Sequence, residues 1–342
     1  MNPLRALRAA FRAHALRPPS GRLLVAVSGG VDSVTLLDLL DRARAKLDLA
    51  LTVAHVDHAV RAGSADDAAF VAEVAAARGL PFVAQRLDGT ARSEDDLRRA
   101  RYAALDRLMQ ATGSERVALG HTRDDQVETL LFRLLRGAGP RGAGAMRFLD
   151  GVRVRPLLDV PRADVQAHAL AAGLAWRDDP TNADPRFSRN RVRHELLPVL
   201  RALAPAGEGA LARFASALRA EHAALDAVGR ELVRAARVPA DDPPGALALD
   251  LAKVPPALRP TLVPALPALV AEVQGGFPEL SQAHFLAFAD LLATRGRPRT
   301  VHLPQGVRVS RRRDRLVVSQ LTPDERSALS RARGLKIPRE PL

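Results

Sequence analysis

The chain has no cysteine among its 342 residues. Disulfides, thiolate-bound zinc, cysteine-bound iron–sulfur clusters and persulfide chemistry are therefore excluded for this polypeptide. Aromatic residues make up only 4%, with one tryptophan and one tyrosine. A row of aromatic platforms for stacking unpaired bases is therefore not expected. No run of the sequence approaches the roughly 18 apolar residues that a membrane-spanning helix needs.

Acidic residues are outnumbered, since 38 Asp and Glu stand against 51 Lys and Arg, which gives a net charge of +13. A basic surplus favours a polyanionic partner, because cations that bind phosphates release counterions. Almost all of the surplus is arginine in an alanine-rich chain, so a biased genome composition explains it equally well. Charge alone therefore leaves a nucleic-acid partner open. The length indicates two domains.

The first 22 residues are rich in arginine and contain no acid, as organellar transit peptides do. Leu4, Leu7, Phe11 and Leu16 instead mark one face of a helix, and an apolar run at residues 23–27 follows directly. We therefore expect an N-terminal helix of the folded protein. Without an apolar signal core, the expected location is cytoplasmic.

From residue 22 to about residue 136, short apolar runs alternate with helical patterns. The expected strands lie at residues 23–27, 49–56, 81–87 and 116–120, and the expected helices begin near Val31, Ser64, Ser93 and Arg123. This alternation is typical of βαβ units, and continuous apolar strands indicate helices on both faces. The sequence predicts an α/β fold with a doubly wound parallel sheet.

The later part of the chain predicts a second, smaller and mainly helical domain that ends in short strands. Helices are expected at residues 191–203, 210–237, 260–273 and 281–293, a break at 238–245, and a turn between strands at residues 305–306. The expected domains are residues 1–204, residues 205–325 and a basic tail at residues 326–342.

The strongest local signal is the hexapeptide SGGVDS at residues 28–33, between the first expected strand and helix. Its glycines allow a tight turn and close approach to a ligand, and the N–H groups of a helix start suit phosphates. Asp32 beside phosphates indicates a bridging Mg²⁺. The missing lysine excludes a Walker A loop. An ordinary capped turn is the alternative, but the Asp and Ser at this spacing favour a phosphate-binding loop.

Polar residues also follow the second strand, where α/β sheets bind ligands. His55 and Asp57 share one strand face and His58 does not, so a loop that frames a nucleotide is favoured over a metal site. A plain solvated loop is the remaining alternative.

The segment at residues 119–129 opens a helix with three acids. Thr122 and Asp125 are spaced as a capping box, so structure alone explains Asp125. Glu128 lies three and four residues beyond Asp125 and Asp124, which places the carboxylates on one side. Such a cluster could hold Mg²⁺ or an ammonium group.

Arginines cluster at residues 98–101, at 189–193 and at 308–315. Arg189 and Arg193 share a helix face that suits phosphate contacts. A solvated basic face is the alternative for each cluster.

Together the motifs resemble one family, the tRNA(Ile)-lysidine synthetases of the PP-loop (N-type ATP pyrophosphatase) superfamily. The matching stretches are VAVSGGVDS, AHVDHAVR, ARYAAL, LGHTRDDQVETLLFRLLRGAGPRGAGAM and DDPTNADPRFSRNRVRHELLP. They cover residues 23 to about 198, and LPQGVRVSRRRDRLVV resembles the middle domain of the family. Longer members have a further C-terminal domain, so the chain resembles the short form.

The resemblance implies an adenine-nucleotide alpha-hydrolase-like fold and a ligase. Such an enzyme joins free L-lysine to C2 of the wobble cytidine of isoleucine tRNA with a CAU anticodon. ATP adenylates the C2 oxygen with release of pyrophosphate, and the lysine amine displaces AMP to give lysidine. ATP and Mg²⁺ are the implied cofactors, and a homodimer is compatible with the family.

The same resemblance implies a role for individual residues. ATP phosphates and Mg²⁺ are assigned to Ser28, Gly29, Gly30, Val31, Asp32 and Ser33, the adenosine to His55, Gly120 and His121, lysine to Arg101, Asp125 and Glu128, and tRNA to Arg189, Arg193 and the arginines at 308–315. Mg²⁺ would be held by Asp32 and Asp125. The implied catalytic residues are Asp32, Asp125 and Glu128, and either of the last two could accept the proton of the lysine amine.

Three other functions are considered. The tRNA-thiolating enzymes of the superfamily need cysteines or an iron–sulfur cluster, which this chain cannot provide. A small-molecule amide synthetase leaves the charge of +13 unexplained. An RNA-binding protein without catalysis would not need Asp32, Asp125 and Glu128 at one edge of the sheet.

Overall fold

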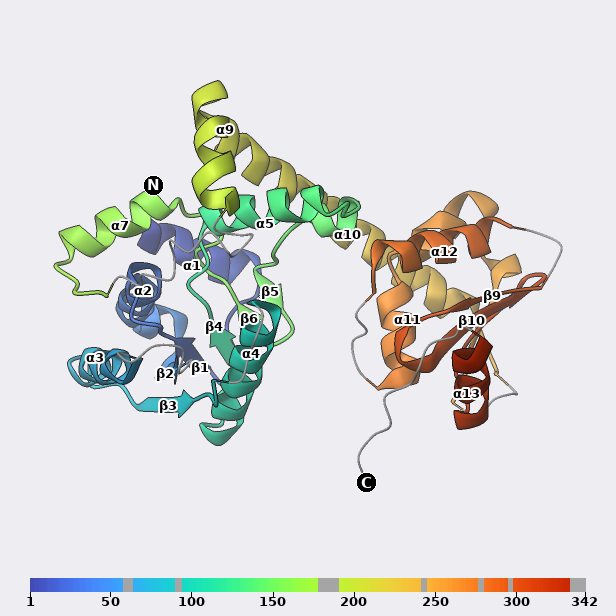
Figure 1. Ribbon diagram of the computed structural model, residues 1–342, viewed down its shortest axis with the longest axis horizontal. Helices are drawn as coiled ribbons and strands as arrows, with labels where there is room; N and C mark the ends of the chain where they lie inside the picture. Colours follow the sequence, from blue (N-terminus) through green and yellow to red (C-terminus); the bar gives the residue numbers. More distant parts are fainter. Residues whose placement is uncertain are drawn as a thin grey trace. The chain divides into compact units, whose positions relative to one another are not determined.

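The structure is a computed structural model that describes residues 1–57, 64–89, 94–177, 191–240, 245–275, 280–294 and 298–332. It divides into two compact units, Met1–Leu218 and Arg219–Leu342 (Figure 1). The division falls inside one long helix, so the boundary near residue 204 stays a prediction. None of the described helices is long and apolar enough to cross a membrane.

The first unit is built on a six-stranded sheet with the strand order β3-β2-β1-β4-β6-β5. The strands are β1 (Arg22–Ala26), β2 (Ala50–Asp57), β3 (Phe82–Arg86), β4 (Arg116–Ala118), β5 (Leu149–Asp150) and β6 (Arg153–Val154). All neighbours pair in parallel except β5 and β6. The expected parallel sheet is confirmed. The β5–β6 hairpin was not predicted, because strands of two residues carry no periodic pattern.

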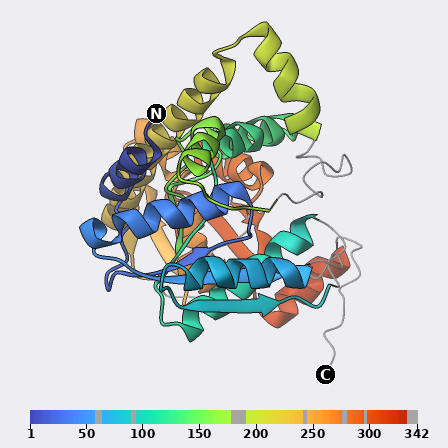
Figure 2. The same ribbon diagram turned by 90° about the vertical axis from the view of Figure 1, so that its left-hand side faces the viewer.

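Helices cover both faces of this sheet (Figures 1 and 2). They are α1 (Pro3–Ala13), α2 (Val31–Leu47), α3 (Ser64–Ala76), α4 (Glu94–Ala111), α5 (Arg123–Leu135), α6 (Pro140–Ala143) and α7 (Arg162–Ala171). On one face, α1, α2 and α7 pack in the same core as Leu23 and Val25 of β1. On the other face, α4 packs against Leu24. Alternation along a single strand thus produces the doubly wound architecture.

The expected helix over residues 191–203 begins as a π-helix (Val192–Leu196) and continues as α9 (Leu197–Leu203). The next helix, α10 (Gly207–Ala236), begins in the first unit. Leu211 and Ala215 of α10 pack against Leu130 of α5. This contact supports α5, whose first turn faces the candidate site.

The second unit contains a five-stranded antiparallel sheet with the order β7-β8-β11-β10-β9. Its elements are β7 (Arg237–Val238), β8 (Leu247–Asp250), α11 (Leu266–Gln274), α12 (Gln282–Ala293), β9 (Arg299–His302), β10 (Val307–Arg312), β11 (Arg315–Gln320) and α13 (Pro323–Ala332). Leu249, Phe288 and Val309 lie in one core, so helices cover one face of the sheet. The expected helical domain with terminal strands is confirmed, and β7 and β8 add two strands that come before α11 and α12.

One expected helix of this unit is divided. Residues 260–273 contain the end of a 3₁₀ helix (Pro256–Leu262) and α11. Prolines at residues 255, 256, 260, 264 and 267 explain the interruption, because proline lacks the N–H that continues an α-helix. The predicted turn at residues 305–306 is present, with Gln305 at a φ of 58°.

Candidate active site

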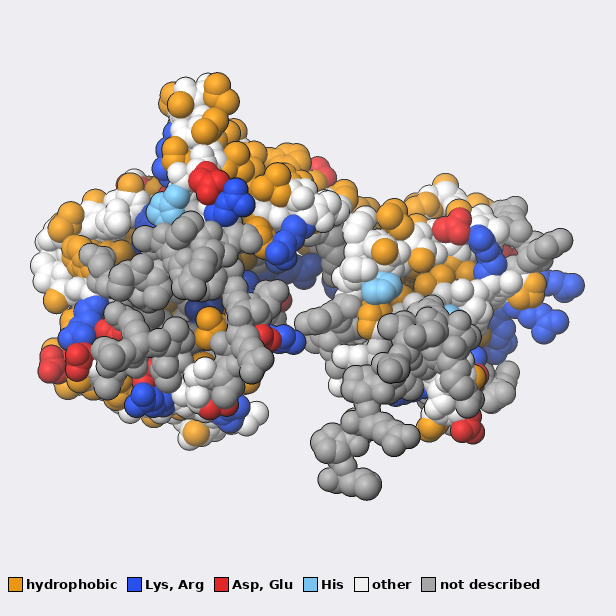
Figure 3. All heavy atoms as spheres, in the orientation of Figure 1, with side chains coloured by type: hydrophobic (Ala, Val, Ile, Leu, Met, Phe, Trp, Pro, Cys, Tyr) orange, Lys and Arg blue, Asp and Glu red, His pale blue; other side chains and the backbone are white. Residues whose placement is uncertain are grey.

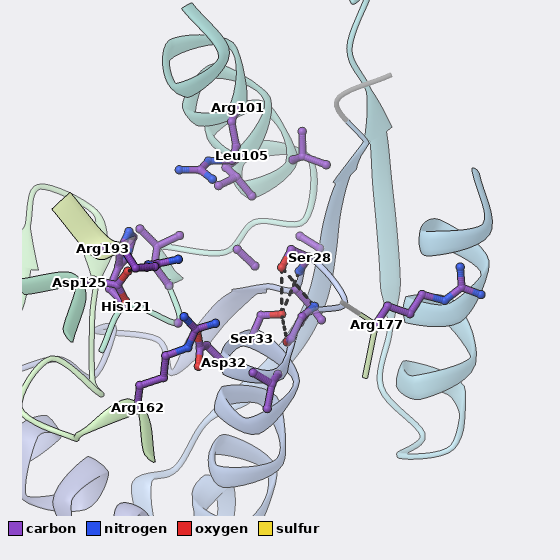
Figure 4. A pocket seen from close by; sticks show the side chains of 18 residues that line it. Ser28, Asp32, Ser33, Arg101, Leu105, His121, Asp125, Arg162, Arg177 and Arg193 are labelled. Carbon is purple, nitrogen blue, oxygen red and sulfur yellow. Dashed lines mark hydrogen bonds and ion pairs between the residues drawn. The ribbon is translucent and has the colours of Figure 1, made fainter. Parts of the chain in front are cut away.

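The loop that leaves β1 closes on itself through hydroxyl groups (Figure 4). The Ser28 backbone N–H donates to Ser33 Oγ at 3.1 Å, and Ser33 Oγ donates to the Gly30 carbonyl at 2.9 Å. The two serine hydroxyls lie 3.2 Å apart. Gly29 has a φ of +95°, which L side chains rarely adopt. The loop thus leads directly into the free N–H groups at the start of α2, a suitable place for phosphates.

A pocket opens over this loop at the carboxyl ends of β1, β2 and β4. It is lined by Ala26, Val27, Ser28, Gly30, Val31, Asp32, Ser33, Ala54, Val56, Arg101, Leu105, Leu119, Gly120, His121, Asp125, Arg162, Arg177 and Arg193. At Gly120, a Cβ would lie 3.1 Å from the Asp32 carbonyl oxygen, so glycine allows the chain after β4 to approach α2 closely. Ten of the residues that the sequence assigned to the site line this pocket.

His55 was assigned to the adenosine but does not line the pocket. Its side chain is buried, and Nδ1 lies 2.9 Å from the Val27 carbonyl oxygen. Because side chains alternate along a strand, Ala54 and Val56 of β2 face the pocket instead. His55 thus contacts the backbone at the start of the loop at residues 28–33. Ala54 and Val56, on either side of it, form an apolar wall of the pocket.

Two adjacent acids cap two helices. Asp125 Oδ2 accepts hydrogen bonds from the Thr122 backbone N–H at 2.8 Å and from Thr122 Oγ1 at 2.9 Å, as the predicted capping box requires. Asp124 Oδ2 accepts from the backbone N–H of Arg162 at 2.7 Å, at the start of α7. Asp125 also lines the pocket, whereas Asp124 does not.

Glu128 holds an arginine of the pocket. Arg193 donates from Nε to Glu128 Oε1 at 2.6 Å and from Nη2 to Oε2 at 2.9 Å. The same Nη2 lies 3.5 Å from Asp125 Oδ1. Glu128 is buried and does not line the pocket. Since Arg193 lies in the π-helical turn, this pair connects that turn to α5, and both acids predicted from the sequence contact one guanidinium.

Asp32 is the acid that belongs to the loop at residues 28–33. Its Oδ2 lies 3.3 Å from Arg162 Nε, and its Oδ1 is buried and accepts no hydrogen bond from the described residues. Burial raises the pKa of Asp32 to about 6, and the negative charges of Asp125 and Asp124 add to the effect, while Arg162 and Arg193 oppose it. A carboxylate in this situation favours a bound cation.

The donors fit a magnesium ion that also binds phosphates. Mg²⁺ commonly takes one or two protein carboxylates and completes its shell with phosphate oxygens and water. Asp32 and Asp125 both line the pocket, and Asp32 Oδ1 has an unused acceptor position. The described residues contain no group of three or more acids and histidines able to enclose a metal by themselves.

Sequence reasoning missed two arginines of the pocket, Arg162 and Arg177. Arg162 follows Pro161, which caps α7, and this helix start was the only available signal. The Arg177 backbone N–H donates to the Gly29 carbonyl at 3.0 Å, and the adjacent Trp176 packs against the main core. Arg189 and the rest of residues 178–190 lie outside the described residues.

The fold and this site define a class. Residues 5–200, more than half of the chain, match the PP-loop domain family. Over longer alignments, the chain is 38% identical to the tRNA(Ile)-lysidine synthase of Geobacter sulfurreducens, covering 90% of this chain and 67% of that protein. It is 40% identical to the protein of the same name from Salinispora tropica, covering 92% of this chain and 96% of that one.

The chain belongs to the tRNA(Ile)-lysidine synthase family. It spans about half the length of some other curated relatives with this name. Among solved structures, it is similar to the U34-tRNA thiolase NcsA from Methanococcus maripaludis with its [4Fe-4S] cluster, with a TM-score of 0.53 and 19% identity over 63% of this chain and 77% of that one. This likeness shows a shared fold, and the present chain has no cysteine for such a cluster.

Proposed function

We propose that this chain ligates L-lysine to C2 of the wobble cytidine in isoleucine tRNA with a CAU anticodon, in the cytoplasm, and converts ATP to AMP and pyrophosphate. The observation that carries the proposal is the convergence of Asp32, Asp125 and the loop at residues 28–33 in one pocket. The near full-length similarity to a tRNA(Ile)-lysidine synthase supports the same conclusion.

In the first step, the cytidine O2 attacks the α-phosphorus of ATP, the bond to the bridging oxygen breaks, and pyrophosphate leaves. The hydroxyls of Ser28 and Ser33 and the N–H groups at the start of α2 would bind the phosphates. Asp32 and Asp125 would hold Mg²⁺, which neutralises phosphate charge when it is bound. Ala54, Val56 and Leu105 form an apolar wall suited to the adenine base.

In the second step, the lysine amine attacks C2, and the C2–O bond breaks as AMP leaves with the former carbonyl oxygen. The amine loses one proton, and of the two candidate acids we assign its acceptance to Asp125, because Asp125 lines the pocket and Glu128 does not. Glu128 fixes Arg193 at the edge of the pocket through two hydrogen bonds. Holding both reactants in line supplies much of the rate enhancement in such a reaction.

The second unit offers a basic surface for the phosphates of tRNA. Figure 3 shows Lys and Arg side chains gathered over strand ends of this unit. Arg312 and Arg313 are exposed at the β10–β11 turn and form no ion pair within the described ranges. Arg311 differs from the expectation, because it is buried and donates to the Leu291 and Leu292 carbonyl groups. Among the arginines at residues 308–315, we therefore assign tRNA binding to Arg312 and Arg313 of the β10–β11 turn.

The direct test measures AMP release from ATP and lysine, with and without an isoleucine CAU-anticodon transcript. Release should need both lysine and this transcript, and a methionine CAU transcript should replace it poorly. Asp125→Asn should reduce the release, whereas Asp41→Asn, on α2 but outside the pocket and paired with Arg44, should not. AMP formed without any tRNA would indicate a small-molecule amide synthetase. Tight tRNA binding without AMP would indicate a binding protein, and either result would reject the proposal.

A further inference from the structure

Arg162 is a pocket residue that no motif of the sequence singled out. It is the first residue of α7, and its side chain extends toward Asp32 (Figure 4). Its Nε lies 3.3 Å from Asp32 Oδ2. Within the described residues, its two Nη groups donate no hydrogen bond. Since these Nη groups have no partner in the part of the chain that the structure describes, the guanidinium is well suited to bind phosphate oxygens beside the loop.

The backbone of Arg162 is fixed at the site. Its N–H donates to Asp124 Oδ2 at 2.7 Å, and the Arg123 N–H donates to the Val160 carbonyl at 2.9 Å. These two bonds join the first turns of α5 and α7. Any change of partner by Arg162 is therefore a movement of its side chain alone.

The rest of α7 is anchored as well. His168 Nε2 lies 2.8 Å from Asp38 Oδ2 of α2, and Val165 and Ala169 are buried in the core. Since α2 also carries Asp32, the helices that bear Asp32 and Arg162 are held in one arrangement.

Two other arginines of the pocket have strong partners. Glu128 binds Arg193 through two hydrogen bonds. Arg177 Nη1 lies 3.2 Å from Asp67 Oδ1, and its side chain points away from the loop (Figure 4). Arg162 instead contacts the carboxylate that the proposed function assigns to Mg²⁺. A cation at Asp32 would compete with the guanidinium, and a triphosphate would offer it new anionic partners.

The location of Arg162 distinguishes the ends of the nucleotide. Arg162 lies beside Asp32 and the start of α2, whereas Leu105 lies across the pocket on α4 (Figure 4). The apolar wall suits the base, so Arg162 is at the phosphate end. On the basis of the proposed function, we propose that Arg162 pairs with Asp32 in the nucleotide-free protein and transfers its guanidinium to the β- and γ-phosphates when Mg–ATP binds.

The test measures binding of Mg–ATP and of AMP by calorimetry, without tRNA or lysine, for the wild type, Arg162→Gln and Arg162→Lys. Arg162→Gln should weaken Mg–ATP binding by about 10- to 100-fold, the usual effect of losing a charged hydrogen-bond partner. AMP binding should change less than about threefold, because AMP lacks the two outer phosphates. Arg162→Lys should have an intermediate affinity for Mg–ATP, since lysine keeps the positive charge but not the planar guanidinium that donates two parallel hydrogen bonds.

The matched control is Arg44→Gln, which removes an arginine that pairs with Asp41 at 3.1 Å on α2 and does not line the pocket. It should leave both affinities unchanged. Unchanged Mg–ATP binding by Arg162→Gln, or an equal loss for AMP, would overturn the assignment. So would a rise confined to the KM for lysine, which would place the lysine carboxylate at Arg162. If wild type binds Mg–ATP but never forms AMP with lysine and tRNA, the proposed function fails while the assignment of Arg162 is still tested by binding.

Discussion

Asp32 combines a functional position with an unfavourable environment. Its pKa is raised to about 6, chiefly by burial. The unfolded chain has the ordinary value of 3.8, so the folded protein binds more protons between these two values. The contribution of Asp32 to stability therefore decreases as the pH rises through this interval, and the ionised group destabilises the fold at neutral pH.

Asp32→Asn should consequently increase the free energy of unfolding at pH 7.5 by about 1–3 kcal/mol while it abolishes AMP release. The gain should be smaller at pH 5, where Asp32 of the wild type is largely protonated. Urea unfolding at the two pH values measures this difference. A variant that is less stable than the wild type at pH 7.5 would contradict the electrostatic explanation.

Asp125 and Glu128 should differ when each is replaced by its amide. Glu128→Gln removes the buried carboxylate that is the main partner of the half-buried Arg193, and should lower the free energy of unfolding by about 2–4 kcal/mol. Asp125→Asn weakens a helix cap and a longer contact with Arg193, and should lower the free energy of unfolding by about 1 kcal/mol. AMP release should decrease for both. Unchanged lysidine formation by both variants would remove both acids from the mechanism.

Single residues also show where sequence reasoning ended. The acids and glycines of the site were predictable because each belongs to a contiguous motif with a chemical reason. His55 was assigned to the adenosine, but its ring contacts the Val27 carbonyl, and Ala54 and Val56 line the pocket. Apolar residues give no sequence signal of a binding surface. Arg162 was missed because a lone arginine at a helix start carries no motif, and only the packing of α7 against α2 brings it to Asp32.

At the scale of elements, the pairing of α2 with α7 determines the geometry of the site. Asp38, buried on α2, accepts hydrogen bonds from Arg42 at 2.7 Å and from His168 of α7 at 2.8 Å. Burial alone would raise the pKa of Asp38, but the hydrogen bonds from His168 and Arg42 outweigh it and lower the pKa. The stability from this carboxylate is present above the unfolded value of 3.8 and is lost as the pH falls through the folded pKa.

Asp38→Asn should therefore lower the free energy of unfolding by about 1–3 kcal/mol at pH 7. Asp41→Asn, on the same helix with a nearby Arg44 partner, should change it by less than about 0.5 kcal/mol. Denaturant unfolding of both variants provides the comparison. Equal losses of unfolding free energy in the two variants would mean that the hydrogen bond between Asp38 and His168 stabilises the protein no more than a surface ion pair does.

Elements were predictable where their patterns are long. The strands and helices of the first sheet alternate over many residues, so their order followed from periodicity. In the second unit, β7 and β8 are short. β7 pairs with β8, and β8 pairs with β11, which lies more than 60 residues later in the sequence. Only tertiary contacts assign such strands. The prolines before α11 were visible, but the 3₁₀ turn that they produce was not expected.

At the scale of the whole molecule, the net charge of +13 predicts that tRNA binding depends on ionic strength. Binding of the isoleucine transcript should weaken by roughly tenfold or more between 50 and 200 mM KCl, because phosphate contacts release counterions. Replacing Arg312 and Arg313 together by Gln should reduce the slope of log K against log salt by about 1–2 without loss of thermal stability. Arg299→Gln, which removes a partner of Asp290 at 2.7 Å, is the control.

A binding constant that does not change with salt concentration would show that the many arginines reflect the composition of the genome and not a polyanionic partner. A slope that is steep but equal in the double variant would keep the nucleic-acid partner and move the contact away from the β10–β11 turn. Filter binding over a series of salt concentrations distinguishes these results.

The hydrogen bond between the Arg177 N–H and the Gly29 carbonyl has a practical consequence. The residue before Arg177 is Trp176, the single tryptophan of the chain, and it is partly buried against the main core. The chain therefore contains one tryptophan, joined by a peptide bond to the residue whose N–H donates to the loop at residues 28–33. We expect its emission to change when that loop rearranges, so that a stopped-flow instrument can follow nucleotide binding without a label.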